Sequence, residues 1–117
     1  MREEKILNIT TLLKRGVLIV RIEGELDMHV ATEFRQTVDH ALETSGVKHV
    51  LFNLQAVNFI DSSGLGVLLG RYKKISALGG LVFATHIQPQ VLQIFELSGL
   101  LKIMKLYHSE KEALECL

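Results

Sequence analysis

Short apolar runs alternate with longer segments of helical periodicity along almost the whole sequence, and this alternation limits the fold more than any other feature. Residues 17–22 form a run rich in β-branched side chains, typical of a buried strand, and Gly24 is expected to end it. Residues 28–44 instead carry apolar side chains at helical spacing, with Asp27 available as an N-cap. Such alternation predicts an α/β domain whose later strands are parallel.

The second half of the chain continues the same order. We expect strands at residues 49–54, 81–85 and 103–107, and helices at residues 65–78, from Pro89 to Gly99 and from Ser109 onward. A more polar first strand turns at Arg15 and Gly16. These segments predict a mixed β-sheet of four to five strands with about four α-helices, in one domain spanning residues 1–117. Because the strands are very apolar, helices should cover one face fully and the other in part.

Composition excludes several functional classes. The 13 Lys and Arg residues balance 13 Asp and Glu residues and are scattered, so neither nucleic acid nor a membrane is an expected partner. The single cysteine, Cys116, can form no internal disulfide, and the five histidines show no spacing typical of metal ligands. No apolar run approaches the roughly 18 residues of a membrane span, and the first residues do not resemble a secretory signal. We therefore expect a cytoplasmic protein without a metal site, and a monomer, since no helix has a surplus apolar face.

The stretch DSSGLGVLLG, which begins at Asp61, is the most unusual local feature. It falls where a strand ends and a helix begins, and in an α/β sheet this edge carries the functional loops. Asp61 or Ser62 can cap that helix, whose unpaired N–H groups and dipole also favour a phosphate. Gly64, which adds nothing to a cap, Gly66 and Gly70 each cost the helix roughly 1 kcal/mol relative to alanine. Either close packing or the approach of another molecule must require these glycines.

Two other functional interpretations of this stretch remain open. A serine hydrolase would need a glycine two residues before Ser62, where Ile60 stands, and His86 would have to act as its base. A small nucleotide-binding module would use the glycines as a phosphate loop, although Val67 and Leu68 replace the Lys and Ser or Thr of that motif. Labelling by a serine-reactive probe and titration with ATP or GTP would distinguish these alternatives.

Three segments of the chain together resemble one known family. DSSGLGVLLGRYKKI from Asp61, GELD from Gly24 and FELSGLLKI from Phe95 are similar to segments of anti-sigma factor antagonists, which belong to the STAS domain family. The likeness is greatest to the antagonists that free the first forespore sigma factor in spore-forming bacteria, and it covers residues 8–114. The resemblance implies a STAS-type fold and a regulatory protein of sporulation that has no cofactor and no catalytic activity of its own.

The resemblance also implies a phosphorylation switch. In that family the anti-sigma factor is an ATP-dependent serine kinase that phosphorylates the serine directly after the aspartate, here Ser62, and a metal-dependent serine phosphatase removes the phosphate. The unphosphorylated antagonist holds the anti-sigma factor and so releases sigma. Ser63 matches a neighbouring hydroxyl that is not the phosphorylation site. The expected partner-binding surface consists of Asp27, Asp61, Ser62, Ser63, Gly64, Leu65 and Gly66.

Overall fold

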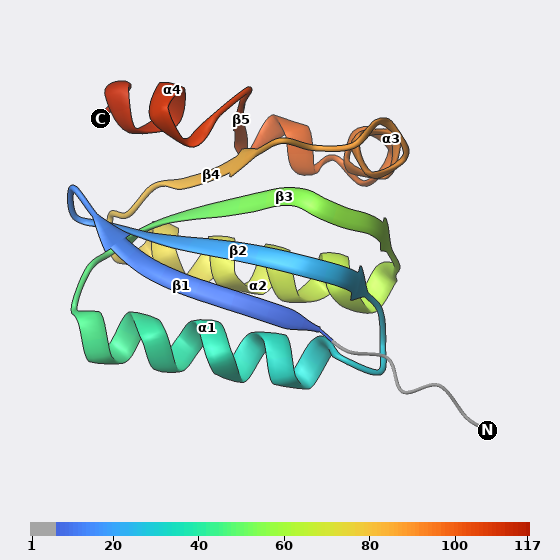
Figure 1. Ribbon diagram of the computed structural model, residues 1–117, viewed down its shortest axis with the longest axis horizontal. Coiled ribbons are helices and arrows are strands. Elements are labelled where there is room, and N and C mark those ends of the chain that lie inside the picture. The colour runs from blue at the N-terminus through green and yellow to red at the C-terminus, as the bar shows by residue number, and fades with distance from the viewer. Residues whose placement is uncertain (1–6) are drawn as a thin grey trace.

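A five-stranded mixed sheet forms the centre of the protein (Figure 1), as seen in a computed structural model that describes residues 7–117. The strands follow one another across the sheet in chain order. β1 (Asn8–Lys14) and β2 (Val17–Leu26) are antiparallel and connect through Arg15 and Gly16, which both have positive φ. Parallel to β2 lie β3 (His49–Ile60), β4 (Val82–Thr85) and β5 (Lys105–Tyr107). The predicted mixed α/β sheet is confirmed.

Helices cover the two faces of the sheet unequally. On one face, α1 (Ala31–Ser45) lies beside α2 (Ser62–Ala77), as Figure 1 shows. α3 (Pro89–Ser98) buries its Val91 and Phe95 in the same core, and a short 3-10 helix, η1 (Leu100–Lys102), follows it. The short α4 (Glu110–Glu115) packs on the opposite face. Three helices therefore cover one face and one short helix covers part of the other, as expected.

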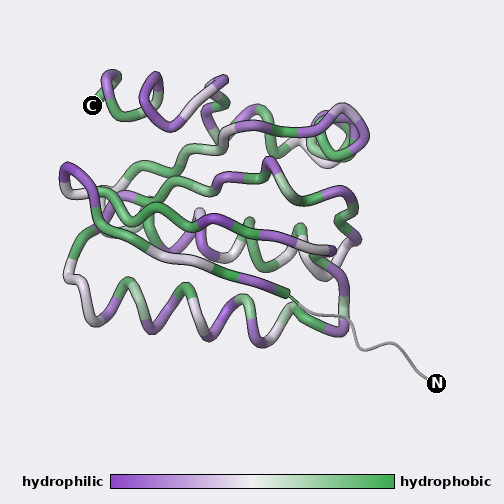
Figure 2. Tube along the Cα trace, viewed as in Figure 1, coloured by the Kyte–Doolittle hydropathy of each residue, from purple (hydrophilic) through white to green (hydrophobic). Residues whose placement is uncertain are grey.

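The central strands are apolar on both sides because each face contacts a helix. Figure 2 shows hydrophobic residues along β2, β3 and β4. Successive side chains of a strand point to opposite faces. Leu18 and Val20 of β2 join the core beneath α1 and α2, whereas Val17 and Ile19 pack with Leu114 of α4. The near-continuous apolar run of β2 thus serves two separate clusters.

Three strands have ends that differ from those the sequence predicts. β2 continues past Gly24 to Leu26, because Gly24 adopts a φ of 131° where the register between β2 and β3 shifts, and does not end the strand. β3 extends to Ile60 although polar residues follow residue 54. β5 begins only at Lys105, since the chain before it forms η1.

The starts of two helices also differ from expectation. α1 begins at Ala31 with Val30 at the N-cap, so the predicted N-cap role of Asp27 is wrong. Asp27 instead accepts a hydrogen bond from the backbone N–H of His29 at 2.9 Å, which stabilises a turn ahead of the helix. α2 begins at Ser62, three residues earlier than predicted, because the glycines are accommodated within its first turns.

Along one edge, the last part of β3 forms hydrogen bonds with side chains and not with a neighbouring strand. β4 pairs with β3 only as far as Asn53. Beyond that point the side-chain amide of Gln88 donates to the Gln55 carbonyl at 2.7 Å, and that of Gln90 donates to the Asn58 carbonyl at 3.4 Å. Side chains at the start of α3 therefore bond to backbone oxygens where a longer β4 would have paired.

A cluster of polar side chains fixes α4 to the sheet. Glu110 accepts hydrogen bonds from the Arg21 guanidinium at 2.9 and 2.8 Å and from the Asn53 side-chain amide at 2.8 Å. The bonds from Arg21, with help from Asn53, lower the pKa of Glu110 to about 2. Ser109 caps the helix by accepting from the Glu112 N–H at 3.0 Å.

No helix among residues 7–117 is long and apolar enough to cross a membrane. Residues 1–6 lie outside the described part of the chain. They begin the segment that we expect not to be a secretory signal.

We expect Glu110→Gln to lower the free energy of unfolding near pH 7 by about 1–2 kcal/mol, because the bond to the half-exposed Arg21 loses its charge. The pKa of Glu110 is lower in the folded protein than its ordinary value of 4.5. The carboxylate therefore stabilises the fold above that ordinary value and loses this effect as the pH falls toward 2. Urea unfolding should show the difference between wild type and variant shrinking from about pH 5 to about pH 3. A difference that stays constant over this range would contradict the assignment.

Candidate functional site

The three segments that resemble the antagonist family meet at one end of the sheet. Residues 24–27 end β2, residues 61–70 start α2, and residues 95–103 run from α3 through η1. Because β2 and β3 are parallel and finish side by side at Leu26 and Ile60, the loops after them share one edge (Figure 1). The functional loops predicted from the sequence are therefore neighbours in the structure.

Asp61 connects the loop after β2 to the start of α2. Its Oδ1 accepts a hydrogen bond from the Gly64 N–H at 3.0 Å, and its Oδ2 accepts one from the Met28 N–H at 2.9 Å. The Asp61 N–H donates to the Leu26 carbonyl at 3.1 Å. Asp61 is thus confirmed as the N-cap of α2, and the N–H that it caps belongs to Gly64, a backbone group that any residue except proline would supply.

The two acids and two serines of the site differ in exposure. Asp27 is only 3% exposed and fixes the loop after β2 through its bond to the backbone of His29. Asp61 and Ser63 are half-buried, whereas Ser62, the first residue of α2, is exposed. Of the two hydroxyls, that of Ser62 is therefore the more accessible to another molecule.

The glycines of α2 have different surroundings. Gly64 is buried, and a β-carbon added to it would overlap the Leu26 carbonyl oxygen and lie 2.9 Å from the Ile60 side chain. Close packing on the end of β2 therefore explains Gly64. A β-carbon at Gly66 or Gly70 would meet no atom within 4 Å, so close packing requires neither of these two glycines.

A groove of about 260 Å³, here called the Ser62 groove, opens beside the start of α2. Its first wall is one face of α2, formed by Ser62, Leu65, Gly66 and Leu69. Its second wall is the turn from α3 into η1, formed by Ser98, Gly99, Leu100 and Ile103. The site residues predicted from the sequence do not include this second wall, although the SGL segment that carries the resemblance marks its position.

Large apolar side chains are exposed around the same end of the sheet. Leu97 of α3 is 85% exposed, and Met28, beside Asp61, is 69% exposed. Phe59 near the end of β3 and Ile103 of the groove are 44% and 36% exposed. Several apolar side chains exposed together are typical of a surface that binds another protein.

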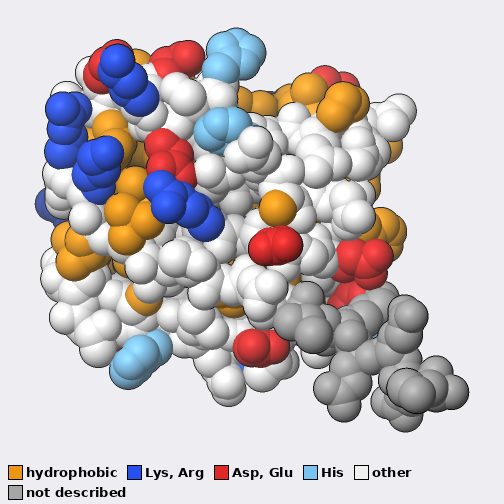
Figure 3. Space-filling view, viewed as in Figure 1, with side chains coloured by type: hydrophobic (Ala, Val, Ile, Leu, Met, Phe, Trp, Pro, Cys, Tyr) orange, Lys and Arg blue, Asp and Glu red, His pale blue; other side chains and the backbone are white. Residues whose placement is uncertain are grey.

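On the face that Figure 3 shows, most basic side chains lie away from this site. The Lys and Arg side chains visible in Figure 3 lie mainly over the side of the β1–β2 turn and α4. The ionised side chains of the two loops beside Ser62 are instead Asp27 and Asp61, and Asp61 already accepts from a free N–H of the α2 N-terminus. These two loops therefore offer no Lys or Arg side chain to the phosphate groups of a nucleotide.

His86, which the hydrolase interpretation needs as a base, bonds elsewhere. Its Nδ1 lies 3.0 Å from the Thr85 Oγ1, and its charge contributes to lowering the pKa of Glu110. His86 therefore lies close to the polar cluster that fixes α4, which packs on the sheet face opposite α2. The arrangement does not support a pairing between His86 and Ser62.

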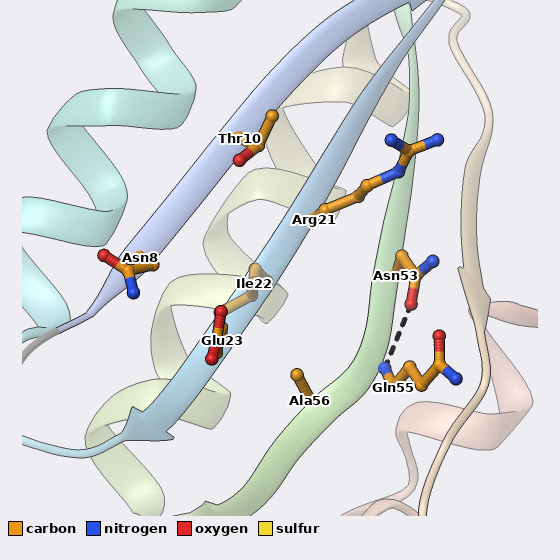
Figure 4. A pocket seen from close by; sticks show the side chains of 8 residues that line it. All are labelled: Asn8, Thr10, Arg21, Ile22, Glu23, Asn53, Gln55 and Ala56. Carbon is orange, nitrogen blue, oxygen red and sulfur yellow. Dashed lines mark hydrogen bonds between the residues drawn. The ribbon is translucent and has the colours of Figure 1, made fainter.

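A second hollow, of about 280 Å³, lies on the part of the sheet that α4 leaves uncovered (Figure 4). Thr10, Arg21 and Asn53 are neighbours across three strands in this hollow. The Asn53 Oδ1 accepts from the Gln55 N–H at 3.0 Å, and Arg21 is bonded to Glu110. Two of its polar side chains, those of Arg21 and Asn53, are therefore already engaged by Glu110 of α4 and by the backbone of β3.

Comparison with known proteins identifies the class of domain. Residues 8–113 match the STAS domain. The chain belongs to the STAS domain family. Within that family, it is 45% identical over 100 residues to the anti-sigma F factor antagonist of Paenibacillus polymyxa, an alignment that covers 86% of each chain.

Solved structures of one antagonist share the fold. The unphosphorylated form of the anti-sigma factor antagonist SpoIIAA has a TM-score of 0.79 and 29% identity over 94% of each chain. The phosphorylated form of SpoIIAA, described as a Bacillus cell fate determinant, has a TM-score of 0.71 and 28% identity, covering 94% of this chain and 97% of that one. The predicted family and its mixed α/β fold are both confirmed.

We expect Gly64→Ala and Gly66→Ala to have opposite effects on stability. The added methyl at position 64 meets the backbone of Leu26 and should lower the free energy of unfolding by about 1–3 kcal/mol. At position 66 it enters open space and should raise this free energy by up to about 1 kcal/mol, because alanine favours the helix. Urea unfolding of both variants measures the two effects, and equal changes would disprove the difference in packing.

Proposed function

We propose that this protein is an anti-sigma factor antagonist that binds an anti-sigma factor, releases the sigma factor and is inactivated by phosphorylation of Ser62. The exposed Ser62 hydroxyl, at the end of the sheet where the three family segments meet, is the observation that carries the proposal. The identity to an anti-sigma F factor antagonist and the existence of a phosphorylated form of SpoIIAA support it.

The partners follow from this proposal. The anti-sigma factor acts as an ATP-dependent serine kinase on Ser62, and a metal-dependent serine phosphatase restores the active form. The protein itself is a substrate and a binding partner in the cytoplasm, with no catalysis of its own. The exposed apolar side chains around Ser62 favour a protein over a small molecule as the ligand of this surface.

Phosphorylation should act on the interface and leave the fold intact. Ser62 is the first residue of α2, where the helix dipole and free N–H groups favour the charge of about −1.5 to −2 that a phosphate brings. At a docked surface the same charge would lose its hydration beside the carboxylate of Asp61. Each 1.4 kcal/mol of this cost reduces affinity about tenfold.

Incubation with the anti-sigma kinase and ATP, followed by intact-mass measurement, tests the phosphorylation site. We expect one added phosphate on wild type and on Ser63→Ala, and none on Ser62→Ala, because the Ser62 hydroxyl is the acceptor. Ser63→Ala is the matched control, since Ser63 is the adjoining residue in the same turn of α2. Wild type that stays unmodified by a kinase active on another substrate would refute the proposal.

Ser62→Asp tests whether the negative charge acts on binding alone. The exposed position at the start of α2 predicts a cooperative thermal transition within about 3 °C of wild type. Affinity for the anti-sigma factor should fall at least about tenfold. Circular dichroism on heating and titration calorimetry measure the two quantities. Loss of the cooperative transition would show that the charge acts on the fold.

A further inference from the structure

We propose that the Ser62 groove receives one apolar side chain of the anti-sigma kinase, and that a phosphate on Ser62 excludes this side chain. This inference rests on the function proposed above and specifies how the partner is held. It assigns a binding role to the turn from α3 into η1.

The chemistry of the walls selects the occupant. Both walls consist of uncharged residues, and their large side chains are those of Leu65, Leu69, Leu100 and Ile103. A charged side chain placed here would lose its hydration and find no ionic partner in the walls of the groove. An apolar side chain such as Leu, Ile, Met or Phe would instead bury its surface favourably. At about 260 Å³ the groove suits a side chain and is too small for a folded element.

The position of Ser62 identifies the molecule that supplies this side chain. Ser62 is itself part of the first wall, so a protein that transfers a phosphoryl group to its hydroxyl must cover the groove at the same time. Leu97, the residue directly before Ser98 of the second wall, is a further exposed apolar side chain in this part of α3. An anchor side chain in a pocket, surrounded by weaker contacts, is a common arrangement in protein interfaces.

Gly66 has a direct role in this arrangement. It lines the groove, and a β-carbon there would meet no atom within 4 Å, so the fold does not require glycine at this position. A side chain at Gly66 would fill the space that the partner needs. Gly70 has the same free space on the same helix but does not line the groove, and nothing in the structure explains why it is glycine. Gly70 therefore provides a matched control.

The same geometry explains how phosphorylation would release the partner. A phosphate on Ser62 would lie at the wall of an apolar groove, where an inserted side chain would remove its water without offering a charge in return. Phosphorylation would then weaken binding in two ways. The charged phosphate would have to be buried, and the contact made by the anchor side chain would be lost. Unphosphorylated Ser62, a small neutral hydroxyl, allows the insertion.

The test compares the affinity of wild type, Gly66→Leu and Gly70→Leu for the anti-sigma kinase, with ADP present so that no phosphoryl transfer occurs. Gly66→Leu should bind at least about tenfold more weakly than wild type, and Gly70→Leu within about twofold of it. Thermal unfolding of both variants should be cooperative, with a Tm no lower than that of wild type, because leucine favours a helix over glycine. If Gly66→Leu binds as wild type does, or both variants weaken equally, the inference is wrong.

The second wall provides an independent variant in case Gly66→Leu does not fold. Ile103→Ser, in that wall, and Leu97→Ser, in the residue directly before it, change exposed side chains and should each weaken binding while the protein stays folded. Unchanged affinity of both serine variants would overturn the inference. Sedimentation of the free protein tests whether a second copy of this chain occupies the groove. A wild-type dimer that dissociates when Gly66 is changed to Leu would also overturn the inference. Wild type that fails to bind the kinase at all would instead refute the function proposed above.

Discussion

The contact between Gly64 and the Leu26 carbonyl determines the geometry of the whole functional end. A larger residue at position 64 would force the backbone to shift, since its β-carbon would overlap the Leu26 carbonyl at the end of β2. Asp61 strengthens the same junction, because its carboxylate bonds both to Gly64 and to the loop after β2. The start of α2 is therefore held on the sheet by backbone contacts, and Ser62 is presented by a rigid element. Such rigidity favours a surface that a partner can recognise without rearrangement.

One side of α2 packs on the sheet, and the opposite side is available for binding. Gly64, Leu68 and Ile75 are buried toward the sheet, whereas Ser62 and Gly66 face outward. The helical period separates the two groups, so that a change on the outer side leaves the core packing intact. Gly64 and Gly66, which look alike in the sequence, are therefore glycine for different reasons. Packing requires Gly64, and we propose that Gly66 keeps the groove open.

The order of strands and helices could be predicted because the apolar periodicity is strong and the turns contain Gly, Pro or Ser. The ends of β2 and β3 could not, because Gly24 occupies a shift in register within the sheet and the polar Gln55 and Asn58 still belong to a strand. Ser62 could be singled out from local motif chemistry. The second wall of its groove could not, because Ile103 approaches α2 only through the tertiary packing of α3 and η1.

The glutamines at the start of α3 also affect how the protein behaves at high concentration. An open strand edge is a template on which another chain can add a strand, and this is a common route to aggregation. Gln88 and Gln90 bond to the backbone oxygens of β3 beyond the end of β4, so these acceptors are already used within the molecule. A regulator whose binding surface is apolar needs such protection nearby. The glutamines therefore leave these two backbone acceptors of β3 unavailable to a strand from another copy of the protein.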